Sequence, residues 1–171
     1  MNLAEHIRDI PDFPKEGIIF KDITTLVGNA EAFKASLDQL QERFQTSDAT
    51  AVVALEARGY IFGAPLADRL GMRFVMVRKP GKLPADTITQ DYDLEYGSNT
   101  LEIHKDALAP GEKVLIIDEL IATGGSAEAT VALVEKLGAK VVGFGAIIEL
   151  AFLKGRSKLD GVAVESLLTF D

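Results

Sequence analysis

The chain has 171 residues, no cysteine and a formal net charge of −8. Because domains commonly run to roughly 100–200 residues, we expect one domain over residues 1–171. The lack of cysteine excludes disulfides, zinc–thiolate sites and thiol nucleophiles, and the acidic balance argues against nucleic acid as a partner. No basic region with a following apolar run opens the chain, and no stretch approaches the roughly 20 apolar residues that span a bilayer. We therefore expect a cytoplasmic protein with no membrane partner.

The first half of the chain alternates short apolar runs with amphipathic segments. Apolar residues at helical spacing predict a short helix over residues 3–10 and a longer one from Asn29 to Phe44. Residues 12–24, punctuated by Pro and Gly, predict an ordered loop with a short extended piece. The pattern then predicts a strand over 51–55, a turn over 56–59, a helix over 60–70 and a strand over 73–77.

The second half begins with little periodicity over residues 79–91, which predicts a long loop. After it we expect a hairpin of residues 94–96 and 100–103, strands over 113–117, 141–150 and 162–170, a helix over 125–137 and a helical turn over 154–159. Apolar strands that alternate with helices indicate an α/β fold with a central, mostly parallel sheet flanked by helices.

One strand-to-helix connection has the residue types of a sugar-phosphate site. The apolar run Val114–Ile117 ends in Asp118 and Glu119, and a short turn then opens a helix. Glycines allow the backbone of this turn to approach a phosphate, and the helix adds N–H groups and the positive end of its dipole. The turn consists of Ala122, Thr123, Gly124, Gly125 and Ser126.

The two acids have a different task from the turn. Asp118 and Glu119 can accept hydrogen bonds from ribose hydroxyls or hold Mg²⁺ directly or through water. No lysine follows the glycines, so an ATP-binding loop is not supported. A group that needs both donors and acceptors within a few ångströms fits ribose 5-phosphate. The alternative interpretation is an ordinary strand-to-helix turn with solvated acids.

The segment Val114–Ser126 resembles the signature of type I phosphoribosyltransferases, which bind phosphoribosyl pyrophosphate (PRPP). The resemblance implies that the acid pair contacts the ribose hydroxyls and that the turn holds the 5′-phosphate. It also implies a small N-terminal base-binding hood, here residues 1–28, and a mobile lid loop, here residues 79–96. The second acid of the family pair is often Asp, whereas this chain has Glu119.

Further segments, in order along nearly the whole chain, resemble the members of this family that act on adenine. They are 12–23, 56–63, 78–84, 94–97, 101–108 and 153–156. The resemblance implies transfer of a phosphoribosyl group from PRPP to N9 of adenine through an oxocarbenium-like transition state, with Mg²⁺ bound mainly through PRPP. It implies a homodimer.

The same resemblance assigns roles to individual residues. The predicted catalytic residues are Asp118 and Glu95, which would manage the proton of the base. Predicted pyrophosphate-binding residues are Arg58, Gly59, Arg78, Lys79 and Lys82. Predicted adenine-binding residues are Ile18, Ile19, Phe20 and Lys21, which stands where the family often has Arg.

Two other functions stay open from the sequence. One is a phosphoribosyltransferase for another purine or a pyrimidine, against which the segments 12–23 and 94–97 argue. The other is a non-catalytic PRPP-sensing regulator, a class that generally has a separate DNA-binding domain. The chain is acidic and has no room for such a domain.

Overall fold

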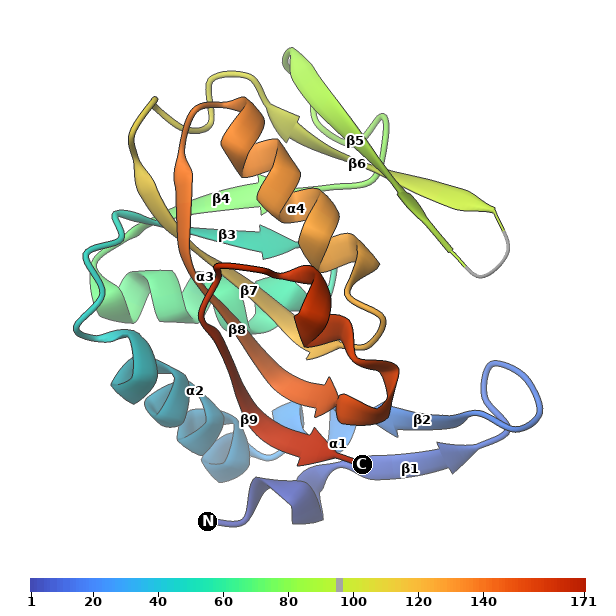
Figure 1. Cartoon of the computed structure of the whole chain (residues 1–171). Helices are drawn as coiled ribbons and strands as arrows, with labels where there is room; N and C mark the ends of the chain where they lie inside the picture. The colour runs from blue at the N-terminus through green and yellow to red at the C-terminus, as the bar shows by residue number, and fades with distance from the viewer. Residues whose placement is uncertain (95–96) are drawn as a thin grey trace.

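A computed structural model describes residues 1–94 and 97–171. Its centre is a five-stranded sheet in the order β4-β3-β7-β8-β9, in which every pairing is parallel. The predicted α/β class with a mostly parallel sheet is confirmed (Figure 1). The sheet strands are β3 (Ala51–Leu55), β4 (Arg73–Val77), β7 (Lys113–Ile121), β8 (Lys140–Leu150) and β9 (Val164–Phe170).

Helices cover both faces of this sheet. The helix α4 (Gly125–Lys136) lies on one face, and α2 (Ala30–Phe44) and α3 (Gly59–Leu70) lie on the other, near the short α1 (Thr24–Val27) (Figure 1). The predicted N-cap of α2 is confirmed, because the side chain of Asn29 accepts a hydrogen bond from the N–H of Ala32 at 3.0 Å.

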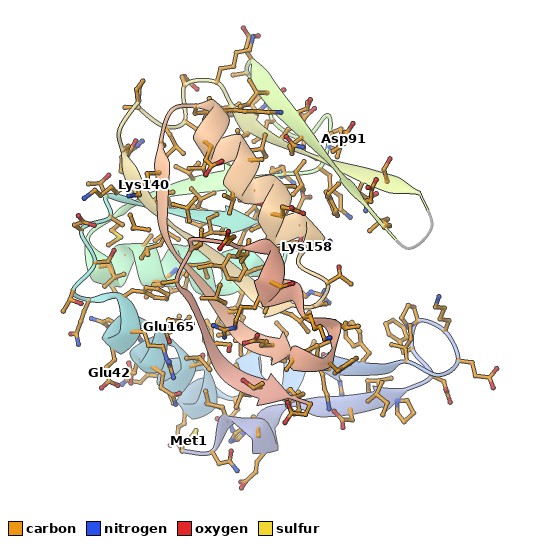
Figure 2. The ribbon with its side chains drawn as sticks, viewed as in Figure 1. Met1, Glu42, Asp91, Lys140, Lys158 and Glu165 are labelled. Atoms are coloured by element: carbon orange, nitrogen blue, oxygen red, sulfur yellow. The ribbon has the colours of Figure 1, made fainter. Side chains whose placement is uncertain are left out.

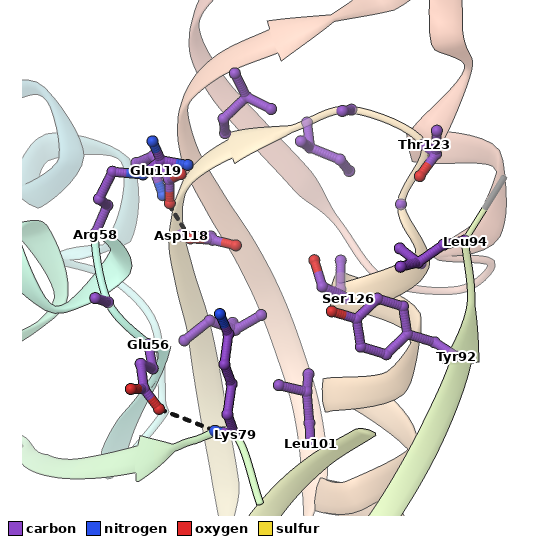
Figure 3. Close-up of a pocket in the computed structure, with 18 residues that line it drawn as sticks. Glu56, Arg58, Lys79, Tyr92, Leu94, Leu101, Asp118, Glu119, Thr123 and Ser126 are labelled. Atoms are coloured by element: carbon purple, nitrogen blue, oxygen red, sulfur yellow. Dashed lines mark hydrogen bonds and ion pairs between the residues drawn. The ribbon is translucent and has the colours of Figure 1, made fainter. Parts of the chain in front are cut away.

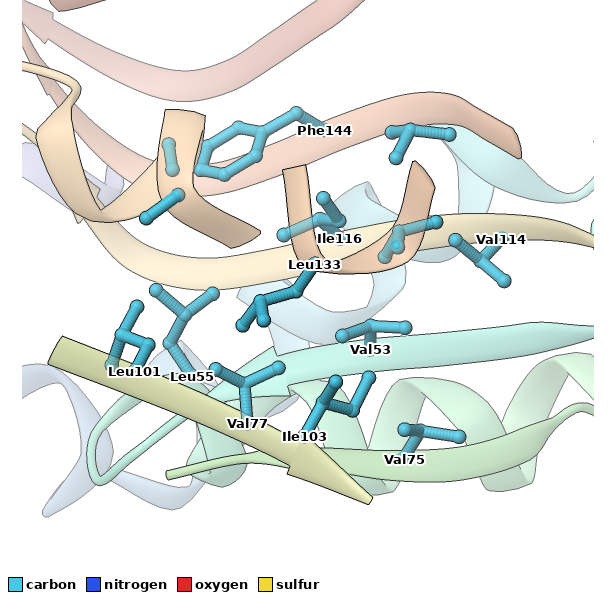
Figure 4. Close-up of a cluster of buried hydrophobic side chains, with 14 of the residues drawn as sticks. Val53, Leu55, Val75, Val77, Leu101, Ile103, Val114, Ile116, Leu133 and Phe144 are labelled. Carbon is cyan, nitrogen blue, oxygen red and sulfur yellow. The ribbon is translucent and has the colours of Figure 1, made fainter. Parts of the chain in front are cut away.

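The central strands are buried on both sides. In β3, Val53 and Leu55 pack into the core under α4, as Figure 4 shows, whereas Val52 packs into the core under α2 and α3. In β7, Ile116 likewise packs into the core under α4, and Leu115 packs into the core under α2 and α3. Successive side chains of a strand point to opposite faces, so a strand covered on both faces is apolar at every position. This explains the continuous apolar runs in the sequence.

Two antiparallel hairpins stand outside the central sheet. One pairs β1 (Arg8–Pro11) with β2 (Ile19–Asp22), and the other pairs β5 (Thr87–Asp93) with β6 (Ser98–His104). Figure 1 shows both hairpins on the side to which the sheet strands point. Since ligands bind at the carboxyl ends of parallel strands, both hairpins are placed beside the expected site.

The predicted helix over residues 3–10 is wrong beyond its first turn. Only a 3₁₀ helix, η1 (Leu3–His6), forms, and the chain then enters β1. The competing structure is the hairpin, in which Ile10 lies opposite Phe20. Pairing with a distant segment therefore prevails over the local helical spacing.

The predicted loop over residues 79–91 is also wrong in its second half. Residues from Thr87 belong to β5, in which Ile88 and Tyr92 pack against the core and the alternating Thr89 and Asp91 are exposed. The hairpin is therefore longer than predicted, and residues 95–96 of the predicted strand lie outside the described range.

The strand β7 is longer than predicted as well. It was expected to end at Ile117, but it pairs with β8 as far as Ile121. Asp118 and Glu119 therefore lie inside the strand and not after it.

The remaining elements follow the predictions closely. The predicted helical turn is the 3₁₀ helix η3 (Gly155–Lys158), preceded by η2 (Ala151–Leu153), and the last strand starts two residues later than expected. Charged residues such as Glu42, Asp91 and Lys158 lie on the outside (Figure 2). In the described part of the chain, no helix has the length and hydrophobicity to cross a membrane.

The β1–β2 hairpin is anchored by one carboxylate. Asp22 accepts hydrogen bonds from Arg8 through Nε at 3.0 Å and Nη2 at 2.5 Å, and from the N–H and hydroxyl of Thr24. The Thr24 N–H and the Arg8 guanidinium lower the pKa of Asp22 to about 2.

This anchor predicts a pH dependence of stability. A free Asp has a pKa of roughly 3.9, so ionised Asp22 stabilises the fold above about pH 4 and loses this effect as the pH falls through about 2. We expect Asp22→Asn to remove that part of the pH dependence, measured by urea unfolding from pH 2 to 6. As the control, we expect the exposed Asp160→Asn to follow the wild-type profile. An Asp22→Asn profile parallel to wild type over this window would contradict the prediction.

Candidate active site

The strands β3 and β7 lie side by side, and the chain leaves them in opposite directions. From β3 it proceeds to β4 on one side, and from β7 to β8 on the other. Such a switch of direction opens a crevice at the carboxyl ends of the strands, where α/β proteins bind their ligands. A cavity of about 470 Å³ lies there, lined by residues 55–58 at the end of β3 and 118–127 from β7 to α4 (Figure 3).

The predicted phosphate-binding turn lines this cavity. Its residues Ala122–Ser126 lead into α4, and Gly124 is the N-cap with a φ of 84°, a conformation that favours glycine. Because Gly124 has no side chain to accept a hydrogen bond, the first N–H groups of α4 are left for a ligand. The turn therefore combines N–H donors, the hydroxyls of Thr123 and Ser126, and a helix N-terminus.

The first acid is buried at the base of the cavity. Asp118 is 8% exposed, and its Oδ1 accepts a hydrogen bond from the N–H of Glu119 at 2.8 Å. Burial, with the carboxyl of Glu119 beside it, raises the pKa of Asp118 well above its usual range, while Arg58 acts in the opposite direction. Asp118 thus lacks a partner that fully compensates its charge, and hydroxyl donors or a positive charge from a ligand would supply one.

The second acid is paired with a cation from the neighbouring strand end. The Nε of Arg58 lies 2.8 Å from Oε1 of Glu119, whose side chain is 12% exposed. Arg58 follows a cis peptide bond between Glu56 and Ala57 and precedes α3, and half of its side chain is exposed. The guanidinium therefore has a carboxylate on one side and the open cavity on the other (Figure 3).

The predicted pyrophosphate residues are only partly brought together. Arg58 and Lys79 line the cavity, and the N–H of Lys79 is held by Glu56 at 2.9 Å (Figure 3). Arg78 does not line it, because its guanidinium is bound to Glu56 at 3.1 and 3.2 Å.

Two further residues of that set lie elsewhere. Lys82 is exposed and does not line the cavity. Gly59 lies behind Asp118: a Cβ on Gly59 would be 3.0 Å from Oδ1 of Asp118, so the glycine allows α3 to begin directly against the buried acid.

The predicted adenine residues lie on β2 and just before it, outside the residues that line the cavity. Phe20 nevertheless faces the site, since the Cζ of Arg58 is 5.5 Å from its ring centroid. Ile18 and Ile19 are exposed. Lys21 is turned to other partners, with its Nζ 2.7 Å from Asp9 Oδ1 and 4.1 Å from the centre of the Phe170 ring.

The second hairpin lines a further side of the cavity. Tyr92, Leu94 and Leu101 line it, and a Cβ on Gly125 would be 3.2 Å from the Tyr92 ring, so the hairpin packs directly on the phosphate turn (Figure 3). Sequence reasoning missed these residues, although the alternation of residues 87–93 was a usable signal. Glu95, one of the two predicted catalytic residues, lies outside the described residues.

Comparison with known proteins agrees with this geometry. A model of the phosphoribosyl transferase domain family matches residues 25–166. The chain is 56% identical to an adenine phosphoribosyltransferase of Maridesulfovibrio salexigens, over 98% of this chain and 99% of the relative. It is 52% identical to that of a Synechococcus strain over the full length of both.

Solved structures agree with the sequence relatives. The adenine phosphoribosyltransferase of Thermoanaerobacter pseudethanolicus matches with a TM-score of 0.96 and 52% identity over 98% of each chain. The enzyme from Saccharomyces cerevisiae, solved with an imino-altritol bisphosphate and adenine, matches with a TM-score of 0.91 and 44% identity over 97% and 96% of the two chains. The chain therefore has the type I phosphoribosyltransferase fold and belongs to the adenine phosphoribosyltransferase family.

Proposed function

We propose that the protein transfers the 5-phosphoribosyl group of PRPP to N9 of adenine, which yields AMP and pyrophosphate for purine salvage. The observation that most directly supports this reaction is the cavity at the β3–β7 switch, where the phosphate turn, the acid pair and Arg58 face one space. The names of the full-length relatives give the base.

The 5′-phosphate is bound by the Ala122–Ser126 turn and the N-terminus of α4. The ribose hydroxyls donate to Asp118 and Glu119. As the bond from C1′ to the pyrophosphate oxygen breaks, the leaving group keeps the electron pair and positive charge develops on the ribose. The N9 lone pair of adenine then forms the bond to C1′, and the base gives up its ring proton, which is the proton assigned to Glu95. The carboxylate of Asp118, whose ionised form is disfavoured by burial, is then stabilised by that charge.

The pyrophosphate is the more strongly charged product. Arg58 and Lys79 line the cavity and neutralise the charge that develops on it. Phosphoribosyltransferases generally use PRPP with Mg²⁺, and the donor set here fits this, because the carboxylates of Asp118 and Glu119 line the cavity. When bound, Mg²⁺ would supply charge neutralisation, held mainly by PRPP oxygens and by these acids through water.

Adenine is bound by the segment Ile18–Lys21. Backbone groups of this segment pair with N1 and the amino group of adenine, and Phe20 packs against the ring. Hypoxanthine and guanine reverse this donor–acceptor pattern, which would leave polar groups unpaired. The exposed Ile18 and Ile19 and the position of Phe20 beside Arg58 support this assignment.

Three larger-scale assignments complete the proposal. The chain forms one domain, in which residues 1–28 act as the base-binding hood and residues 79–96 as the lid. The chain forms a homodimer, and Arg78 and Lys82, which do not line the cavity of their own chain, serve the partner's site. A cytoplasmic location stays a prediction from the sequence.

An assay with four bases tests the proposed reaction. The protein is incubated with PRPP, Mg²⁺ and either adenine, hypoxanthine, guanine or xanthine, and the products are separated. We expect a nucleotide product from adenine alone. If adenine gives no AMP, the proposed reaction is wrong, and a product from another base would overturn the proposed base selection.

The role of Glu95 is tested by Glu95→Gln, which keeps the shape of the side chain and removes its acid. General acid–base catalysis contributes about 10²–10⁴-fold to rates, so we expect kcat to fall within that range. The KM for PRPP should change little, because the ribose and phosphate contacts remain. Unchanged turnover in steady-state kinetics would exclude the role.

The role of Arg58 is tested by Arg58→Ala. Loss of one charged contact to the leaving group should lower kcat/KM for PRPP by about 100-fold. The control is Arg69→Ala, which breaks an exposed 2.7 Å ion pair with Asp38 away from the cavity and should leave the kinetics as in wild type. Equal kinetics for the two variants would contradict the assignment.

A further inference from the structure

A second glycine supports the phosphate turn from outside the cavity. A Cβ on Gly155 would lie 2.3 Å from the carbonyl oxygen of Ala122 and 2.9 Å from the nitrogen of Gly124. In return, a Cβ on Gly124 would lie 2.4 Å from the carbonyl oxygen of Gly155. The two backbones are therefore in direct contact, and neither position has room for a side chain.

The residue after Gly155 is fixed by a buried carboxylate. Arg156 binds Glu149 through Nε to Oε1 at 2.9 Å and through Nη2 to Oε2 at 2.5 Å, and it donates from Nη1 to the carbonyl of Val164 at 2.6 Å. Glu149 is 7% exposed and also accepts a hydrogen bond from the hydroxyl of Ser166 at 2.6 Å. A bidentate pair of this kind restricts the orientation of both side chains.

The location of this pair connects it to the phosphate turn. Glu149 lies near the end of β8 and is the register partner of Ile121 on β7, immediately before the turn begins. Lys154, with a φ of 55°, turns the chain so that Gly155 lies against Ala122 and Gly124. Both sides of the Gly124–Gly155 contact are thus attached to neighbouring strand ends.

We propose that Glu149 and Arg156 are positioning residues that hold Gly155 against the Ala122–Ser126 turn and so set the N–H groups that bind the 5-phosphate. The proposal rests on the assignment of that turn to the phosphate. Among the described residues, neither Glu149 nor Arg156 lines the cavity, so both act through Gly155.

If Glu149 and Arg156 only stabilised the fold, a variant that keeps its stability would also keep its affinity for the phosphate. Glu149 is buried, whereas the side chain of Arg156 is 48% exposed. Replacement of both partners by apolar residues of similar size leaves no unpaired charge in the core, and such replacements are often neutral or stabilising. A double variant with Met at both positions can therefore keep the fold while it loses the directional contacts. Under the proposal, this variant loses affinity for the phosphate without losing stability.

The experiment measures the dissociation constant for ribose 5-phosphate by calorimetry, together with the KM values for PRPP and adenine and the Tm. The variants are Gly155→Ala, which enters the backbone contact, and the double variant Glu149→Met with Arg156→Met. We expect both to weaken ribose 5-phosphate binding and to raise the KM for PRPP by about 10-fold to 100-fold, as misplacement by about 1 Å does. The KM for adenine should stay within about 2-fold, because the base is bound on the other side of the site.

The control is the double variant Arg43→Met with Glu165→Met, which removes an exposed 2.6 Å pair between α2 and β9. It should bind ribose 5-phosphate as the wild type does. Wild-type affinity in the folded Glu149/Arg156 double variant would overturn the positioning role. If the wild-type protein itself does not bind ribose 5-phosphate, the assignment of the turn fails instead, and the positioning role fails with it.

Discussion

The pairing of β3 with β7 is the constraint on which the site depends. Their register, from Ala51 opposite Val114 to Ala54 opposite Ile117, brings the carboxyl end of β3 beside the acid pair of β7. Each strand contributes one half of the site: Arg58 follows β3, and the acid pair lies within β7. Because the chain leaves the two strands on opposite sides, α3 and α4 do not fill the space between them.

The electrostatics of the site follow from this placement. Asp118 is buried on the central strand β7, and burial disfavours its ionised form in the absence of a ligand. Glu119 is compensated by Arg58, yet that guanidinium is also the cation that a pyrophosphate would attract. In the proposed reaction, substrate would give each of these charges a better partner: ribose hydroxyls for Asp118 and pyrophosphate for Arg58.

Local patterns were sufficient for much of this structure. The strands β3 and β4 follow from continuous apolar runs, and α2 follows from its N-cap and spacing. The turn at 122–126 could be predicted as a binding segment because its glycines and hydroxyls, with the acids just before it, together suit a ribose phosphate. The β1 strand was missed because its apolar residues fit a helix as well, and only pairing with β2 decides between them.

Other parts of the site have no local signal in the sequence. The contact between Gly124 and Gly155 joins residues far apart in the chain, and a lone glycine gives no indication of what it touches. The distribution of cations is another example. Arg78 and Lys79 are adjacent, but Glu56, at the end of β3, binds the guanidinium of Arg78, whereas Lys79 lines the cavity. Such choices depend on which elements meet in the fold.

A crystal structure of the protein with AMP is the most direct test of the site. We predict the phosphate of AMP within hydrogen-bond distance of the N–H groups of the Ala122–Ser126 turn and the ribose hydroxyls on Asp118 and Glu119. The adenine ring should lie against Phe20. A phosphate bound elsewhere, with the turn at the N-terminus of α4 free of ligand, would contradict the account.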